Sequence, residues 1–429
     1  MPVTCVIGMH WGDEGKGGIV DMLAGDADLV VRCQGGANAG HTVHVGQAIY
    51  KFHLLPCGVL RKNVENLIGH GVVVDLEKVL EEIETLRSHS VDPLGRLFIS
   101  NRCHVLMPYH KKLDGLSEKL LDKGALGTSK RGIGPCYADK VSYRGLRIAD
   151  VYDKDFLCKS LKKNLMATNA LLEHVYGEKP YDLDELVEST SALAAKIRPF
   201  VTDGLALIHK ALKADRRILV EGAQGTLLDV DYGTYPFVSA SNASVHGVSS
   251  GCGIPERKIN TIIGVTKAYS TRVGAEAGPF PTEEKGPDAE VIRKRGKEYG
   301  TTTGRPRQCG WLDLVATRYS VQVNAVDFLA VSLLDVLDVF ETIKVCEAYE
   351  LDGRRVDYFP ASCAELMRVK PIYREMPGWK SDITGCRKWE DLPWKAQEYL
   401  EFIGRFTGAP VRMVRLGPER EQTVKRLGT

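Results

Sequence analysis

Short apolar runs alternate along this chain with segments in which apolar residues recur every three or four positions. The runs are rich in β-branched residues and end in glycines or polar residues, which predicts strands at 3–7, 29–31, 71–74, 217–220, 259–265 and 326–334. Helical spacing is clearest after Asp75, a predicted N-cap, where the apolar positions are Leu76, Val79, Leu80, Ile83 and Leu86.

This alternation predicts an α/β fold with a large, mainly parallel sheet covered by helices on both faces. Segment 150–215 is rich in Leu, Ala, Lys and Glu and is expected to form a helical insertion. Segment 276–310 is turn-rich and charged, and we expect mobile substrate loops there. From about residue 340, short strands and loops are expected. We interpret residues 1–429 as a single domain, although the length also permits two.

Composition narrows the class of protein. The net charge of +2 gives no general signal for nucleic acid or an anionic membrane, so an anion site requires locally placed groups. The 11 cysteines contain no C-x-x-C pair, which favours free thiols in a reducing compartment over a zinc site or a disulfide framework. The N-terminus lacks a signal-peptide pattern and no apolar run is long enough to span a bilayer, so we expect a cytoplasmic location.

The strongest chemical signal is the glycine-rich segment 8–18, GMHWGDEGKGG, between the first strand and a helical stretch. Backbone N–H groups of such a loop converge on phosphate oxygens, and Lys16 adds a positive charge. An ordinary P-loop has Ser or Thr after the lysine, whereas this chain has Gly17. A carboxylate beside a triphosphate needs a cation or a proton, so Asp13 is a candidate magnesium ligand or general base. An acidic surface turn before a helix is the alternative interpretation.

A second small-residue loop, QGGANAGHT at 34–42, follows the second predicted strand. Asn38 can donate to and accept from a nucleotide. His41 can donate a proton or stabilise a transferred phosphoryl group. A lone histidine is more often structural, but its position in a glycine-rich loop after a strand favours function.

Together, WGDEGKG at 11–17 and NAGH at 38–41 resemble the adenylosuccinate synthetase family. The resemblance extends along essentially the whole chain through GIGP at 132–135, EGAQGTLLD at 221–229, GTYP at 233–236, KAYSTRVG at 267–274, TTGR at 302–305, GWLD at 310–313 and Gly417-Pro418.

The resemblance implies a ligase that forms adenylosuccinate from inosine monophosphate (IMP) and L-aspartate, with hydrolysis of GTP to GDP and phosphate, as the first committed step from IMP to AMP. A base removes the N1 proton of IMP, the 6-oxygen attacks the γ-phosphate, and aspartate displaces phosphate from the 6-phosphoryl intermediate. By resemblance Asp13 is the proton acceptor, His41 is the proton donor, and Gln224 is a further catalytic residue. One Mg²⁺ per subunit is expected on Asp13 and the carbonyl of Gly40, and the protein is expected to be a homodimer.

Three binding sets follow from the same resemblance. The triphosphate set is Gly12, Asp13, Glu14, Gly15, Lys16, Gly17, Gly18, Gly40, His41, Thr42, Arg307, Asp335, which would pair with guanine, and Gly417. The IMP set is Asp13, Glu14, Gly15, Lys16, Asn38, Ala39, Gly40, His41, Ser129, Gln224, Ser239 and Arg305. The aspartate set is Thr301, Thr302, Thr303, Gly304, Arg305 and Arg307, whose arginines suit a dicarboxylate.

The chain departs from the family pattern at several positions. His10 replaces glutamine, Gly18 replaces lysine, Lys130 replaces glycine and Glu276-Ala277 is an insertion. Tyr143 stands where an arginine normally reaches the neighbouring subunit's substrate phosphate, with Arg144 offset by one position. At the base of the triphosphate, Leu333 replaces lysine and Arg415 replaces a small polar residue.

These departures keep a paralogous ligase open, one that uses ATP or another 6-oxopurine nucleotide. Two other classes are weaker. A P-loop switch or kinase is disfavoured by Gly17, and a non-catalytic nucleotide sensor is disfavoured because Asp13 and His41 are both retained.

Overall fold

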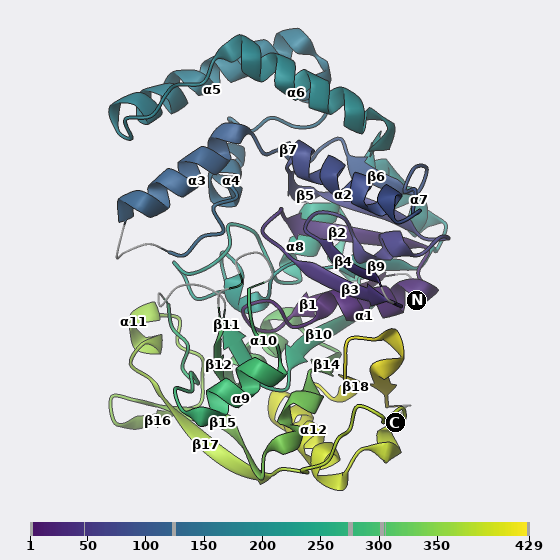
Figure 1. Ribbon diagram of the computed structural model, residues 1–429, viewed down its shortest axis with the longest axis vertical. Helices are drawn as coiled ribbons and strands as arrows, with labels where there is room; N and C mark the ends of the chain where they lie inside the picture. Colours follow the sequence, from purple (N-terminus) through teal and green to yellow (C-terminus); the bar gives the residue numbers. More distant parts are fainter. Residues whose placement is uncertain are drawn as a thin grey trace.

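An eleven-stranded sheet forms the centre of the computed structural model, which describes residues 3–46, 48–121, 126–272, 278–300, 304 and 306–426 (Figure 1). The strand order is β19-β18-β14-β10-β1-β9-β2-β5-β6-β8, with β7 paired to β5. The strands are β1 (Val3–Gly8), β2 (Leu29–Gly35), β5 (Glu65–Val74), β6 (Leu97–Ser100), β7 (His104–Val105), β8 (Val201–Thr202), β9 (Ile218–Glu221), β10 (Thr261–Lys267), β14 (Phe328–Ser332), β18 (Val411–Arg415) and β19 (Thr423–Lys425).

Strand β19 runs antiparallel to β18, and the other pairings in this sheet are parallel. The carboxyl ends of the parallel strands therefore meet at one edge, where ligands of such sheets bind. The predicted fold class is confirmed, and each predicted strand overlaps an observed one.

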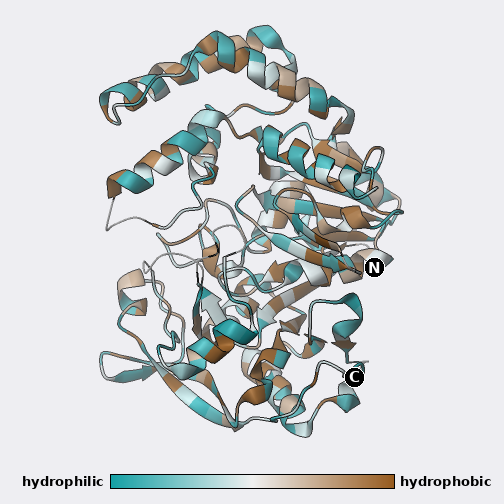
Figure 2. Ribbon diagram, in the orientation of Figure 1, coloured by the Kyte–Doolittle hydropathy of each residue, from teal (hydrophilic) through white to brown (hydrophobic). Residues whose placement is uncertain are grey.

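Helices cover both faces of the sheet. They are α1 (Lys16–Leu23), α2 (Leu76–Ser88), α3 (Pro108–Leu121), α4 (Ile133–Val141), α5 (Lys154–His174), α6 (Leu183–Ile197), α7 (Gly204–Lys213), α8 (His246–Cys252), α9 (Pro287–Arg295), α10 (Leu314–Asn324), α11 (Cys363–Leu366) and α12 (Trp394–Thr407). Asp75 caps α2, as predicted, by accepting a hydrogen bond from the Lys78 N–H. The outward surface of α2 is mainly hydrophilic (Figure 2).

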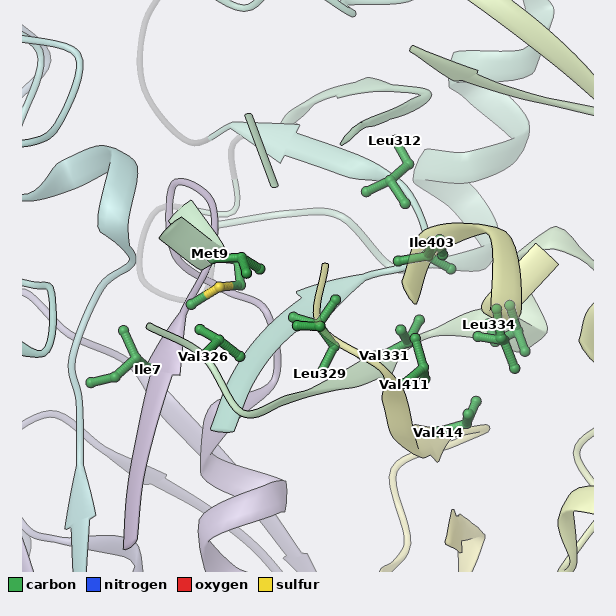
Figure 3. Packing of buried hydrophobic residues seen from close by; sticks show 14 of the residues in the cluster. Ile7, Met9, Leu312, Val326, Leu329, Val331, Leu334, Ile403, Val411 and Val414 are labelled. Carbon is green, nitrogen blue, oxygen red and sulfur yellow. The ribbon is translucent and has the colours of Figure 1, made fainter. Parts of the chain in front are cut away.

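Side chains along β1 point alternately to the two faces of the sheet, and each face has its own hydrophobic core. Val3, Cys5 and Ile7 belong to a cluster that includes residues of α7, α8 and α12, whereas Val6 belongs to a cluster with residues of α1, α2, α5 and α6. Figure 3 shows the first cluster near β14 and β18, where Val331, Leu334, Val411 and Val414 pack together. Burial on both faces fixes the register of the central strands and hence the positions of the loops at their carboxyl ends.

Smaller sheets complete the fold. Strands β3 (His41–Val45) and β4 (Ala48–Phe52) pair, as do β11 (Ser270–Arg272) and β12 (Gln308–Gly310). A further sheet contains β13 (Leu312–Asp313), β15 (Thr342–Leu351), β16 (Arg354–Val356) and β17 (Lys370–Pro377).

The predicted helical segment at 150–215 is confirmed by α5, α6 and α7, of which α5 and α6 lie at one end of the molecule (Figure 1). The prediction of loops throughout 276–310 is wrong for α9, which begins at Pro287 and buries only Ala289 and Ile292. A helix with so few apolar residues gives little periodic signal. The prediction of short strands and loops beyond 340 is confirmed by β16, β18 and β19. It is wrong for β15, which spans 10 residues, and for α12, which spans 14.

All 11 cysteines are free, as expected. No helix among the described residues combines the length and apolarity needed to cross a membrane.

Candidate active site

The loop between β1 and α1 has the backbone of a phosphate-binding turn. Gly12 and Gly15 have φ values of 84° and 83°, and Gly15 is the N-cap of α1. This left-handed conformation is accessible to glycine at little cost. Asp13 also has a positive φ, 60°, which is unusual for a residue with a side chain. The loop thus presents the N-terminus of α1 and the Asp13 side chain to the same space.

Glu14 stabilises this loop from within. Its side chain is buried and accepts hydrogen bonds from the N–H groups of His10 and Gly12, both at 3.0 Å, and from Lys16 Nζ. Burial works to raise the pKa of Glu14, but Lys16 and the backbone donors outweigh it and the net pKa lies below the ordinary value. Glu14 therefore holds the loop and Lys16 in place, while the neighbouring Asp13 faces outward.

His41 lies at the start of β3 and contacts a buried carboxylate. Its Nδ1 donates to Glu221 Oε1, and the other oxygen of Glu221 accepts from the Cys57 N–H at 2.8 Å. Burial acts to raise the pKa of Glu221, whereas His41 and Arg32 lower it, and the net shift is downward. Glu221 is thus a negatively charged positioning residue that orients the His41 ring.

His41, Cys57 and Glu221 also form a group whose donor atoms lie within 4.8 Å of one another. The hydrogen bonds among them account for this proximity. Sulfur and imidazole donors do not suit Mg²⁺, which prefers oxygen ligands. The Asp13 carboxylate and the Gly40 carbonyl, by contrast, are oxygen donors on residues that line one cavity, so they fit the implied ion.

Three side chains predicted to hold IMP come together from distant parts of the sequence. Gln224 Nε2 donates to Asn38 Oδ1 at 3.1 Å, and Asn38 Nδ2 donates to Ser239 Oγ at 3.4 Å. Gln224 Oε1 is buried and has no hydrogen-bond partner among the described residues. A buried acceptor without a donor is costly, which indicates a ligand with an N–H or O–H group at this point.

The loop that carries Ser129 is held by acidic groups on α3. Glu118 accepts hydrogen bonds from the N–H groups of Leu126, Gly127 and Thr128 at 2.9–3.1 Å. Asp114, one helical turn earlier, accepts from Thr128 Oγ1 and from the Gly132 N–H, both at 2.8 Å. One face of α3 therefore fixes the loop that carries Ser129.

Asp13 is ion-paired in this structure. Arg307 Nη2 lies 2.7 Å from Asp13 Oδ2, and Arg307 Nη1 lies 2.6 Å from Glu298 Oε2. Glu298 is buried and also accepts hydrogen bonds from Lys267 Nζ and Tyr269. Arg307 thus connects the candidate base to a buried charged network.

One cavity of about 690 Å³ brings most of the predicted residues together. Its lining includes Gly12, Asp13, Gly15, Lys16, Gly17, Asn38, Ala39, Gly40, His41, Thr42, Ser129, Gln224, Ser239 and Arg307. Glu14, Gly18, Gly304, Asp335 and Gly417 are outside the lining set. The predicted ligands Thr301, Thr302, Thr303 and Arg305, and the inserted Glu276-Ala277, lie outside the described residues.

Asp335 follows β14 at the carboxyl edge of the sheet. Burial raises its pKa to about 6, and its Oδ1 is a buried acceptor without a hydrogen-bond partner in the described chain. An unpaired carboxylate oxygen at this edge suits recognition of N–H donors on a base.

Residues at or beside positions where the chain departs from the family pattern differ in their burial and contacts. His10 is buried against Thr317, with 2.8 Å between its Nε2 and the Thr317 hydroxyl, and burial lowers its pKa to about 4, so it is neutral at pH 7. Tyr143 is 95% exposed and is not among the cavity-lining residues. Arg144 is ion-paired with Asp139 at 2.7 Å.

Several residues of the site were not singled out by sequence reasoning. Glu221, Lys267 and Arg272 lie within motifs of the family resemblance that give them no individual role, and Glu298 lies in none of these motifs. Arg272 is buried, lines the cavity and packs over Trp11 and Phe237. Glu221 could have been suspected as an acidic residue that ends an otherwise apolar strand.

The parallel sheet, the glycine-rich loop after β1 and the single cavity that contains Asp13 and His41 are typical of an α/β enzyme with a nucleotide-phosphate site. The adenylosuccinate synthetase family model matches residues 5–424. The chain therefore belongs to the adenylosuccinate synthetase family, whose members make adenylosuccinate from IMP and aspartate.

Individual relatives support this family assignment. The chain is 48% identical to the adenylosuccinate synthetase of Carboxydothermus hydrogenoformans and 45% identical to that of Alkaliphilus metalliredigens, with 99% of each chain covered in both cases. The fully ligated adenylosuccinate synthetase of Plasmodium falciparum superposes with a TM-score of 0.93 at 36% identity, over 99% of this chain and 100% of that one. A cyanophage S-2L succinoaminodeoxyadenylate synthetase, bound to dGMP and dATP, shares the fold with a TM-score of 0.61 at 18% identity, over 99% and 95%.

Proposed function

We propose that this single-domain protein joins IMP to L-aspartate with GTP as the phosphoryl donor, through a 6-phosphoryl-IMP intermediate, in AMP synthesis. The observation that carries the proposal is the position of Asp13 and His41 on one cavity that also contains Asn38, Gln224 and Ser239. The cavity volume, about 690 Å³, is in the range of small-molecule sites.

The first step needs a base and a stabilised phosphoryl group. Asp13 accepts the N1 proton of IMP, the 6-oxygen forms a bond to the γ-phosphorus, and the bond from that phosphorus to the β–γ bridging oxygen breaks to release GDP. His41, held by Glu221, donates a hydrogen bond to the transferred group. Gln224 Oε1, which lacks a donor in the described chain, accepts from the purine nucleotide.

In the second step the amino nitrogen of aspartate bonds to C6, the bond from C6 to the 6-oxygen breaks, and the departing phosphate carries away that oxygen and takes up the amine proton. Arg307 binds the dicarboxylate or the triphosphate after releasing Asp13. The aspartate loop would be completed by Thr301, Thr302, Thr303, Gly304 and Arg305.

The donor lies along the N-terminus of α1. Backbone N–H groups that donate to the phosphates come from Gly12, Gly15, Gly17, Gly18 and Thr42. Lys16 supplies a positive charge. Asp335 accepts from the guanine edge, and Gly417, which follows β18, completes the set of donor-binding residues. Asp13 and the Gly40 carbonyl would hold one Mg²⁺, which when bound neutralises charge on the phosphates.

A homodimer is proposed as well. The exposed Tyr143 occupies the position from which the family shares a site between subunits, and the adjacent Arg144 supplies a cation. Light scattering tests this assembly, and a fully active monomer would refute it.

The reaction is tested by incubating the protein with Mg²⁺, aspartate, IMP and GTP, omitting each in turn, and detecting products by mass. Adenylosuccinate that requires all four components, and is lost in Asp13→Asn, supports the proposal. Triphosphate hydrolysis without IMP and aspartate would instead indicate a nucleotide switch.

Leu333 and Arg415 favour one alternative, a ligase with a different nucleotide preference. The fold is shared with a phage synthetase whose structure contains dGMP and dATP. Parallel assays with ATP and with dGMP distinguish it. Product with those nucleotides but not with GTP and IMP would mean that the nucleotide specificity differs while the type of reaction is the same.

A further inference from the structure

A buried thiol lies beside the histidine and the carboxylate of the candidate active site. Cys57 Sγ is 3.4 Å from Glu221 Oε1 and 3.7 Å from His41 Nδ1, and His41 Nδ1 donates to the same carboxylate oxygen. All three side chains are buried. The reaction proposed above uses His41 and Glu221 but gives the thiol of Cys57 no part.

The spacing of these three atoms fits a tetrahedral metal ion. Zn²⁺ binds sulfur at about 2.3 Å and nitrogen or oxygen at about 2.0–2.2 Å, so the ligand atoms of a tetrahedral site lie roughly 3.3–3.8 Å apart. Both distances from Cys57 Sγ fall in this range. His41 Nδ1 and Glu221 Oε1 are closer together because they share a proton, and they would separate when an ion replaces it.

The donor atoms favour a particular kind of ion. Thiolate, imidazole and carboxylate groups together suit Zn²⁺ and other borderline-soft divalent cations, whereas Mg²⁺ prefers oxygen ligands. The Cys57 N–H donates to Glu221 Oε2 at 2.8 Å, which fixes the carboxylate and leaves Oε1 for the ion. The backbone of Cys57 therefore orients one ligand, and its side chain supplies another.

The thiol lies close to the wall of the large cavity. Gly17 and His41 both line that cavity. A Cβ atom built on Gly17 would lie 3.1 Å from His41 Cβ and 3.3 Å from Cys57 Sγ, so the sulfur is directly behind a residue without a side chain. The serine or threonine of an ordinary P-loop would cover the sulfur at this position. An ion can therefore reach the three atoms from the cavity.

The charges of the ligands are compatible with a divalent cation. Burial and then the negative charge of Glu221 raise the pKa of the Cys57 thiol well above its usual range, so the sulfur is protonated in the absence of an ion. A bound divalent cation opposes the charge of Glu221, and a coordinating thiol loses its proton. The two anionic ligands, Cys57 and Glu221, then balance the charge of the ion.

We propose that Cys57 Sγ, His41 Nδ1 and Glu221 Oε1 form an inhibitory binding site for a borderline-soft divalent cation such as Zn²⁺. The Cys57 thiol proton leaves to solvent, and the neutral His41 ring carries its proton on Nε2 instead of Nδ1. No atom is oxidised or reduced. His41 loses its hydrogen bond to Glu221 and cannot become the doubly protonated acid, so the ion stops turnover. Binding itself needs no substrate.

Titration of the metal-free protein with Co²⁺ tests the site directly, because thiolate ligation of Co²⁺ produces a near-ultraviolet absorption band that oxygen ligands do not. The band should saturate at a single ion per chain, and Zn²⁺ should remove it. Cys57→Ser keeps a hydroxyl group near Glu221 and Cys57→Ala removes the donor, and both variants should lack the band. Cys136→Ser is the matched control, since Cys136 is another buried thiol that donates to a carbonyl, and it should keep the band.

Zinc affinity is measured by competition with a chromogenic chelator. Loss of the Cys57 ligand should raise the Kd of Zn²⁺ by at least about 10- to 100-fold, the effect that changes around the ligands of a metal already cause. Zn²⁺ should inhibit adenylosuccinate formation by the wild type and by Cys136→Ser at the same concentration. Cys57→Ser, compared with its own rate without zinc, should resist that concentration.

Three results would overturn the proposal. They are the absence of a thiolate band in the wild type, an equal band in Cys57→Ser, and zinc inhibition that persists in Cys57→Ser and is relieved by excess Mg²⁺, which would place the ion on the oxygen ligands instead. Circular dichroism checks the fold of each variant. The spectra require no substrate, so they decide the metal site even in a protein that makes no adenylosuccinate.

Discussion

The carboxylate of Asp13 and the guanidinium of Arg307 form an ion pair, with 2.7 Å between Oδ2 and Nη2. The proposed base and a proposed ligand of the aspartate substrate thus neutralise each other. Since Arg307 is also paired with Glu298, it can release Asp13 without becoming an isolated buried charge.

Asp13→Asn should abolish most catalysis while preserving the loop. Asparagine keeps the shape of the side chain but cannot accept the proton, so kcat should fall by about 10²- to 10⁴-fold. Initial rates measure this effect, and circular dichroism checks folding. The exposed Asp26, just after α1, provides the control Asp26→Asn, which should retain normal rates. Activity above about a tenth of wild type would remove Asp13 as the base.

Glu221→Gln should lower kcat through His41. The amide can still accept from Nδ1, but it does not stabilise a protonated imidazole, so kcat should fall by about 10- to 100-fold. The KM values for IMP and GTP should change little. A lower kcat with both KM values retained is a result that purely structural damage does not produce. A normal kcat in this variant would contradict the positioning role.

Glu298→Ala should destabilise the fold. Its carboxylate is buried among Lys267, Tyr269 and Arg307, and its removal leaves Lys267 without its carboxylate and Arg307 with Asp13 as its remaining one. Loss of one member of a buried charged group costs about 3–5 kcal/mol, measured as a change in the free energy of unfolding in urea. The control is Glu350→Ala, which breaks the exposed pair with Lys370 and should cost less than about 1 kcal/mol. Equal effects would mean that the buried network contributes little.

Guanine nucleotide binding should weaken as pH falls through about 6. Burial raises the pKa of Asp335 to about 6, and only the ionised carboxylate accepts hydrogen bonds with both oxygens. The group is ionised above its pKa and protonated below it, so the Kd of GTP should rise by about tenfold for each pH unit below 6. Titrations at pH 7.5 and 5.0 measure the change. Asp335→Asn should bind GTP weakly at both values, and the same pH dependence in that variant would exclude Asp335.

Local sequence signals predicted the elements that build the phosphate site. The apolar run at 3–7, the glycines that follow and Lys16 specify a strand, a turn and a helix within a few residues, so no distant contact is needed to recognise them. Helix α9 could not be predicted in this way, because only Ala289 and Ile292 are buried and its other residues are mostly charged or polar. Two buried positions give no clear helical periodicity.

The contacts between side chains of the site could not be predicted from the sequence and depend on the folded chain. Glu14 and Asp13 are adjacent acidic residues in one loop, yet the backbone turns Glu14 into the protein and Asp13 toward the cavity. His41 contacts Glu221 because β9 pairs with β2 in the sheet. The Arg415 side chain lies over Gly18 because β18 pairs with β14 in the same sheet. Local conformations and the available chemical groups can be predicted from the amino-acid sequence, because they depend on near neighbours along the chain. Strand order and burial decided their partners, because both depend on contacts between residues hundreds of positions apart.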